Sequence, residues 1–288
     1  MTRLVRLRDG TGRVRTGAVD GTAIAVFDGD DPLALLDGLP EPVERLEALD
    51  PDTLDLPTPW ELLTPIAAPE TWAAGVTYER SREARVAESQ VKDVYDRVYE
   101  AQRPELFLKD AAGRRTVGPR QTIGVRGDAT WSVPEPELAL VLDAGGVPLA
   151  VTIGNDVSSR DIEGANPLYL PQAKIYGRAC ALGPALLVPE DWAAPFSIEL
   201  VVRDAAGGVL FDGSTSTASM RRSFDELVGY LARDNPVARG TVLLTGTGVV
   251  PPDDVSLQPG HSVEIHVPGI GTLSNPVGPA VEIVRTGV

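Results

Sequence analysis

Short segments in which apolar and polar residues alternate make up most of the chain, and 29 glycines and 25 prolines separate them. Alternation with a period of two is typical of half-buried β-strands, and turn residues between such segments favour a β-rich fold. The strands predicted from this pattern span residues 3–7, 22–27, 72–76, 105–109, 122–126, 136–142, 147–153, 197–202, 241–244, 262–267 and 280–285.

Helical spacing replaces this alternation in a few places. Residues 78–102 are rich in charge and contain neither glycine nor proline, which predicts a helix. A second helix is expected at 222–233, with Ser223 as its N-cap. Residues 32–46 are expected to form shorter helical stretches that prolines interrupt.

A proline-rich stretch divides the chain. Residues 49–69 contain five prolines and little periodicity, which is typical of a linker. We therefore expect a small N-terminal α/β module in residues 1–65 and a larger domain in residues 66–288. The fold class expected for the whole chain is α+β and β-rich.

Composition narrows the class of protein. The chain carries 26 basic and 41 acidic residues, a net charge of −15, and such a surface repels nucleic acid and anionic membranes. Its one cysteine, Cys180, rules out an intrachain disulfide. No apolar run approaches the roughly 20 residues that a membrane helix needs. We expect a soluble cytoplasmic protein that binds neither nucleic acid nor a membrane.

Three carboxylates are predicted to converge on one hairpin. Glu135 and Glu137 share a strand face, because side chains two residues apart point the same way. Gly145-Gly146 is a strong signal for a two-residue hairpin loop, so that residue 144 pairs with residue 147. Asp156 then lies opposite Glu135 on the same face as both glutamates.

Carboxylates held so close repel one another unless protons or a cation neutralise them. A site with only oxygen ligands favours a hard ion such as Mg²⁺, Mn²⁺ or Ca²⁺. From these residues alone, the solvated face of an edge strand remains an equal alternative for the Glu-x-Glu pair.

Several motifs in a fixed order carry a resemblance to a known family. They are Glu135-Pro-Glu137-Leu, GNDVSSRD (154–161), GVTY (75–78), ELFLK (105–109), QAKIYGRACALGP (172–184), TGTG (245–248) and GIGTLSNPV (269–277). Together they resemble the fumarylacetoacetate hydrolase family across about residues 70–285. The resemblance implies a mixed β-sandwich roll, Mg²⁺ or Mn²⁺ held by Glu135, Glu137 and Asp156, and a homo-oligomer, either a dimer or a tetramer.

Residues 162–176, IEGANPLYLPQAKIY, look like the branch of this family that holds the 2-keto-3-deoxy-pentonate (xylonate or arabinonate) dehydratases. The likeness implies that Lys174 and Glu105 are catalytic, and that a small 2-oxo acid loses water to give 2-oxoglutarate semialdehyde. Without this context, Lys174 could be a solvated loop lysine and Glu105 a structural ion-pair residue.

One departure from the family pattern bears on the reaction. Its hydrolases and decarboxylases carry Gly-x-Asn-Tyr-x-x-His-x-x-Glu, whose His–Glu pair activates water, whereas this chain has Thr77, Ser81 and Ala84 at the Asn, His and Glu positions. Serine and alanine cannot perform that proton transfer near neutral pH. A lyase is therefore favoured. A hydrolase or decarboxylase of acylpyruvates or oxaloacetate is the alternative, and a non-catalytic 2-oxo acid binder is a third hypothesis.

The residues expected to contact the substrate are Gly246, Thr247, Arg80, Ser81, Arg85 and Ser159. Small residues at 246 and 247 let backbone N–H groups and a hydroxyl approach a carboxylate, although a tight structural turn explains them equally well. For the arginines two interpretations stay open, a lid that closes over the site and a solvated helix face.

Overall fold

The computed structural model describes residues 2–48, 50–88 and 97–281. Within these residues, one large sheet has the strand order β4-β3-β2-β1-β14-β12-β11-β17-β6-β7, and a five-stranded sheet has the order β16-β15-β18-β19-β9. The large sheet consists of β1 (Thr2–Arg8), β2 (Val14–Asp20), β3 (Ala23–Asp28), β4 (Glu44–Glu47), β6 (Glu70–Gly75), β7 (Glu105–Ala111), β11 (Pro136–Leu142), β12 (Pro148–Asp156), β14 (Cys180–Val188) and β17 (Val242–Leu244), with β5 (Glu61–Leu62) and β8 (Thr116–Val117) paired at its side.

The second sheet consists of β9 (Ile123–Val125), β15 (Ser197–Arg203), β16 (Val209–Ser216), β18 (Ser262–Val267) and β19 (Gly271–Pro279). The two sheets pack face to face through a core that includes Leu138 and Leu140 of β11 and Leu200 and Ile265 of the second sheet. The other face of β11 is buried too, against the first part of the large sheet, because Ala139 packs with Leu4 in a separate cluster. The mixed, β-rich sandwich expected from the sequence is confirmed.

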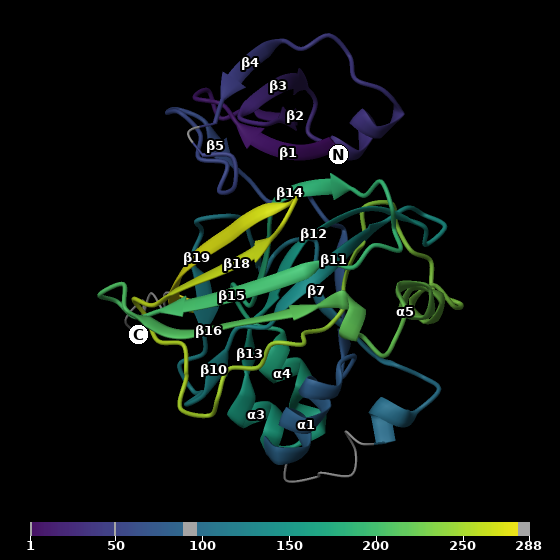
Figure 1. Ribbon diagram of the computed structural model, residues 1–288, viewed down its shortest axis with the longest axis vertical. Helices are drawn as coiled ribbons and strands as arrows, with labels where there is room; N and C mark the ends of the chain where they lie inside the picture. The colour runs from purple at the N-terminus through teal and green to yellow at the C-terminus, as the bar shows by residue number, and fades with distance from the viewer. Residues whose placement is uncertain (1, 49, 89–96, 282–288) are drawn as a thin grey trace, which may run out of the picture.

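The N-terminal strands continue the large sheet. β1 pairs with β14, with Leu4 opposite Leu186, and β1 to β4 follow one another as antiparallel neighbours (Figure 1). The helical expectation for 32–46 is correct only for the 3₁₀ helix Pro32–Asp37. Residues 44–47 form β4 instead, because pairing with β3 buries Leu46. The division of the chain at residue 65 stays a prediction.

The central hairpin has the expected register through a different loop. Pro136 pairs with Asn155, and the N–H of Asp156 donates to the carbonyl of Glu135 at 3.0 Å, as the predicted pairing requires. The two-residue loop is wrong. The N–H of Asp143 bonds the carbonyl of Val147, which leaves a three-residue loop ending at Gly146, and a β-bulge after Val141 compensates for the extra residue.

The predicted helices are found where the structure describes them. α1 spans Glu79–Glu88, residues 97–100 are helical, and residues 89–96 lie outside the described chain. α5 spans Phe224–Leu231, and the hydroxyl of Ser223 accepts the N–H of Glu226, so the predicted N-cap is confirmed. None of the described helices is long and apolar enough to cross a membrane.

Some elements were not anticipated. The pattern missed the strands β2, β4, β14, β16 and β19 and the short helices α3 (Arg160–Ala165) and α4 (Leu170–Lys174). β14 is buried along almost its whole length, so it lacks the alternation that marks a half-buried strand. The last strand ends at Pro279 rather than covering 280–285, of which 282–285 lie outside the described residues. Figure 1 shows α1, α3 and α4 together at the end of the sandwich opposite β1 to β4.

Candidate active site

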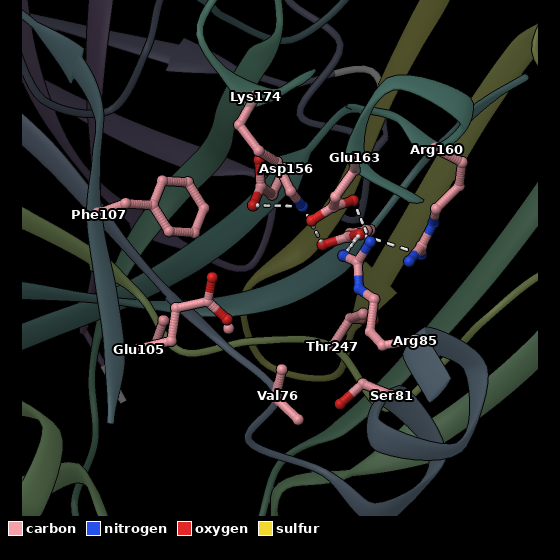
Figure 2. A pocket seen from close by; sticks show the side chains of 13 residues that line it. Val76, Ser81, Arg85, Glu105, Phe107, Asp156, Arg160, Glu163, Lys174 and Thr247 are labelled. Atoms are coloured by element: carbon pink, nitrogen blue, oxygen red, sulfur yellow. Dashed lines mark hydrogen bonds and ion pairs between the residues drawn. The ribbon is translucent and has the colours of Figure 1, made fainter. Parts of the chain in front are cut away.

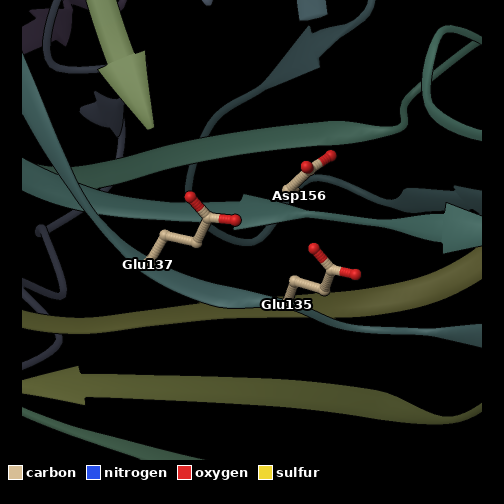
Figure 3. A group of neighbouring side chains, drawn as sticks. All are labelled: Glu135, Glu137 and Asp156. Carbon is tan, nitrogen blue, oxygen red and sulfur yellow. The ribbon is translucent and has the colours of Figure 1, made fainter. Parts of the chain in front are cut away.

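Three buried carboxylates meet where the central hairpin ends. Glu135 directly precedes β11, Glu137 lies within it, and Asp156 closes β12 (Figure 3). The side chains offer ligand oxygens that all lie within 4.8 Å of one another. All three residues are at least 96% buried, with exposed fractions of 4%, 1% and 2%. The solvated edge-strand alternative for Glu135 and Glu137 is therefore excluded, and we call these three residues the carboxylate cluster.

Electrostatics in the carboxylate cluster suit a cation. Burial, followed by the charges of Asp156 and Glu135, raises the pKa of Glu137 well above its usual range. The N–H of Gly246 donates to Oε2 of Glu137 at 2.5 Å and partly offsets this effect. A divalent ion would relieve the repulsion, and a set of three carboxylates fits Mg²⁺ or Mn²⁺ by donor chemistry.

Lys174 enters the carboxylate cluster from α4. Its Nζ lies 2.7 Å from Oε2 of Glu135, 3.1 Å from Oδ2 of Asp156 and 2.5 Å from the hydroxyl of Ser158. Burial lowers the pKa of this ammonium group, but the charges of Asp156 and Glu135 outweigh burial and raise it overall. Lys174 therefore keeps its proton at neutral pH in this structure.

Further buried cations surround the same carboxylates. Arg85 of α1 donates to Oε1 of Glu135 at 2.7 Å and pairs with Glu163 of α3. Arg160 lies 3.0 Å from the same oxygen of Glu135. Burial favours the protonated form of Glu135, but Lys174, Arg85 and Arg160 together lower its pKa. These cations offset part of the negative charge of the buried carboxylates.

A small cavity of about 20 Å³ opens beside the cluster. Its lining residues are Ala74, Gly75, Val76, Ser81, Arg85, Glu105, Phe107, Glu135, Asp156, Arg160, Glu163, Lys174 and Thr247. Figure 2 shows Glu105 and Phe107 on one wall and Lys174, Asp156 and Glu163 on another. A volume of this size holds about one water molecule, which is less than the volume of a sugar acid.

Glu105 reaches the cavity from β7, whose alternation places Phe107 on the same side. Burial of its carboxyl group, followed by the negative charge of Glu163, raises the pKa of Glu105 to about 7. The side chain of Glu105 lines the cavity, although the residue as a whole is only half-buried because β7 is an edge strand. A carboxyl group with this pKa can gain or lose a proton near neutral pH.

The structure brings some of the expected substrate contacts to the cavity. Thr247, Ser81 and Arg85 line it. Gly246 lies beside it, where its N–H reaches Glu137 and its φ of 93° suits glycine.

Two expected contacts lie elsewhere. The side chain of Arg80 is 60% exposed and pairs with Glu83 at 3.7 Å on the solvent side of α1, so its contact with a substrate stays a prediction. Ser159 is buried in β13 (Ser158–Ser159), opposite Ser132 of β10 (Ser132–Val133), outside the cavity lining.

Four site residues were not assigned a role from the sequence. Phe107 lines the cavity, and Lys109 pairs with Asp156 and donates to the carbonyl of Val157 at 3.0 Å. Both share a strand face with Glu105, so the alternation of 105–109 could have identified them. Arg160 and Glu163 are three residues apart on α3, a spacing that puts both on one helix face.

The chain is similar to several known proteins. Residues 71–278 match the family model described as the fumarylacetoacetate (FAA) hydrolase C-terminal domain. A probable 2-keto-3-deoxyxylonate dehydratase of Haloferax volcanii is 53% identical over 216 residues, which cover 74% of this chain and 73% of the relative. A 2-dehydro-3-deoxy-D-arabinonate dehydratase of Saccharolobus solfataricus is 47% identical over 219 residues, with the same coverage of 74% and 73%.

A solved structure is similar over almost the whole chain. It is a 2-keto-3-deoxy-D-arabinonate dehydratase complexed with magnesium and 2,5-dioxopentanoate, with a TM-score of 0.84 and 38% identity. The match covers 96% of this chain and 99% of the other. Because the family model matches residues 71–278, which are most of the chain, this chain belongs to the fumarylacetoacetate hydrolase family.

Proposed function

We propose that this protein is a Mg²⁺-dependent hydro-lyase that dehydrates a 2-keto-3-deoxy pentonate of the xylonate or arabinonate type to 2-oxoglutarate semialdehyde. The observation that carries the proposal is the buried carboxylate cluster, of which Glu135 and Asp156 line one cavity together with Lys174 and Glu105. The similar dehydratases support the substrate class, because 2,5-dioxopentanoate is the same compound as this semialdehyde.

The carboxylate cluster is the proposed metal site, with Glu135, Glu137 and Asp156 as ligands. When bound there, Mg²⁺ (or Mn²⁺) would polarise the 2-keto group of the substrate and make its C3 protons more acidic. Arg85 and Arg160 add positive charge beside the cluster and favour binding of the substrate carboxylate.

Two residues of the chain are suited to move the protons. Glu105, with a pKa of about 7, is the proposed base that takes a proton from C3. Lys174, whose pKa is raised, is the proposed acid that protonates the C4 hydroxyl, so that the C4–O bond breaks and water leaves. Proton shifts in the unsaturated 2-oxo acid then give the semialdehyde. Near neutral pH, Glu105 is partly ionised and can accept a proton, whereas Lys174 carries the proton that it would donate.

The side chains at positions 81 and 84 disfavour hydrolysis. Ser81 lies at the cavity, where its hydroxyl donates to the carbonyl of Tyr78 at 2.8 Å, and Ala84 is buried on the same helix. Neither can activate water as a His–Glu pair does. His261 and His266 belong to the region of β18, away from the cavity lining.

Incubation of the purified protein and Mg²⁺ with 2-keto-3-deoxyxylonate, 2-keto-3-deoxyarabinonate, acetylpyruvate and oxaloacetate tests the proposal. Formation of 2-oxoglutarate semialdehyde from a deoxy sugar acid is the expected result. Release of pyruvate from acetylpyruvate or oxaloacetate, with no semialdehyde from either sugar acid, would instead identify a hydrolase or decarboxylase. Binding without turnover of any compound would identify a 2-oxo acid binder.

The setting of the enzyme is also part of the proposal. We infer a homo-oligomer, either a dimer or a tetramer, that works in the cytoplasm without nucleic-acid or membrane partners. The acidic composition supports the absence of nucleic-acid and membrane partners, and the buried, unpaired Cys180 supports the cytoplasm. The homo-oligomer rests on the family resemblance alone. Light scattering of the purified protein tests the oligomeric state.

A further inference from the structure

Gly75 occupies a position where its own backbone does not require glycine. It is the last residue of β6, and its φ lies outside the left-handed region that L side chains avoid. Glycine weakens a strand, because it costs more conformational entropy than other residues and offers no side chain to pack. A glycine in such a place often marks the close approach of another group.

The group that approaches is the side chain of Glu105. The two residues are direct partners in the β6–β7 ladder. A Cβ atom on Gly75 would lie 2.6 Å from Cδ of Glu105 and 3.2 Å from its Cγ, and closer still to one carboxylate oxygen. The carboxyl group therefore occupies the space that the Cβ atom of any other residue at position 75 would fill.

The neighbouring pair of the ladder also combines a small residue of β6 with a large side chain of β7, but the small residue there has a Cβ atom. Ala73 is the partner of Phe107, so small residues of β6 lie under large side chains of β7 at both positions. Phe107 and Glu105 both line the cavity (Figure 2). Alanine suffices under the ring, whereas the carboxyl group of Glu105 requires glycine.

We propose that Gly75 is a positioning residue for Glu105. Because Gly75 has no Cβ atom, the carboxyl group of Glu105 can lie at the cavity. The inference rests on the proposed dehydration, in which Glu105 exchanges a proton with the substrate. A methyl group at position 75 must displace the carboxyl group, because that group is the flexible end of a side chain, whereas Gly75 is held in the ladder by its pairing with β7. Lys174 and the carboxylate cluster lie on other elements and keep their places.

A double-mutant cycle tests the proposal. Gly75→Ala is expected to lower kcat by ~10–10²-fold, the usual effect of misplacing a reacting group by about 1 Å, with a smaller change in KM. Glu105→Gln removes the same proton transfer, so Gly75→Ala should change kcat less than about twofold in that background. Equal effects of Gly75→Ala in both backgrounds, or no effect in the parent, would overturn the proposal.

Controls separate this result from a loss of fold or metal. Gly229→Ala on α5, where an added Cβ meets nothing within 4 Å, should leave kcat unchanged. Mg²⁺ affinity by calorimetry should be the same in Gly75→Ala and the parent. If Gly75→Ala fails to fold, Gly75→Ala/Glu105→Ala should fold, because the overlap is gone; a double variant that stays unfolded would contradict the proposal. Absence of dehydration by the parent would instead count against the proposed function.

Discussion

The ammonium group of Lys174 lies 2.7 Å from Oε2 of Glu135, inside the carboxylate cluster. The same group lies 3.1 Å from Oδ2 of Asp156, so that it bridges two of the three proposed metal ligands. A lysine in this position stabilises the clustered charges of the metal-free protein. It also attracts the same oxygens that a divalent ion needs.

Lys174→Met is expected to separate the proposed proton transfer by Lys174 from its competition with the metal ion. Turnover should fall by ~10²–10⁴, the usual contribution of a positioned proton transfer. Mg²⁺ affinity should stay the same or rise, because no ammonium group then competes for Glu135 and Asp156. Calorimetric titration with Mg²⁺ and a steady-state assay measure both. A large loss of Mg²⁺ affinity would show that Lys174 organises the metal site.

Hydrogen exchange at C3 identifies the base. If Glu105 removes the C3 proton, exchange of substrate C3 protons with deuterated solvent should persist in Lys174→Met and be lost in Glu105→Gln. NMR under single-turnover conditions measures this exchange. The opposite pattern would show that Lys174 is the base and Glu105 the acid.

Removal of the metal should abolish activity. EDTA is expected to reduce dehydration to background, and Mg²⁺ or Mn²⁺ should restore it, because three buried carboxylates form the cluster. The check is an activity assay on protein whose metal content is measured by mass spectrometry. Full activity in a metal-free sample would refute the mechanism.

Glu137→Gln should weaken metal binding without harming the metal-free fold. Loss of one ligand charge is expected to lower Mg²⁺ affinity by more than ~10-fold. The pKa of Glu137 is raised, so the amide resembles the protonated carboxyl that the metal-free protein favours. Metal titration and thermal melting of the metal-free variant measure the two effects. An unchanged Mg²⁺ affinity would place the metal elsewhere.

Activity should rise with pH through the titration of Glu105. Its pKa is raised to about 7 in the metal-free protein, and bound Mg²⁺ lowers this pKa. The rising part of the plot of kcat against pH should therefore be centred at or below about pH 7. Glu105→Gln should lose this rise.

The same group predicts a stability effect of defined sign. Because folding raises the pKa of Glu105, its contribution to stability is full below about pH 4.5 and is lost as the pH rises through about 7. Metal-free Glu105→Gln should therefore show a smaller fall in melting temperature between pH 5 and pH 8 than the parent. Parallel curves for the two proteins would contradict the shifted pKa.

Ser81→His/Ala84→Glu should create hydrolytic activity on acylpyruvates. Position 81 lies at the cavity, so a histidine there can reach a water beside the substrate. Dehydration should not improve, because it does not use this pair. The measurement is pyruvate release from acetylpyruvate, with Ser81→His alone as the control. If the parent already cleaves acetylpyruvate rapidly, another group must activate water.

The sequence by itself determined the carboxylate cluster. Alternation places Glu135 and Glu137 on one face, and a glycine turn brings Asp156 opposite Glu135. The loop has three residues rather than two, yet the register holds because the bulge after Val141 absorbs the difference. Short-range periodicity decides the face on which a side chain lies, so this part of the site can be predicted from neighbouring residues.

Tertiary structure alone decided which distant side chains join the cluster. Arg85 and Arg80 lie on the same helix, but only Arg85 faces Glu135 and Glu163, while Arg80 is exposed. The position of Lys174 depends on the packing of α4. These contacts join residues 39 to 78 positions apart along the chain, so the packing of α1, α3 and α4 against the sheet fixes them rather than any local pattern.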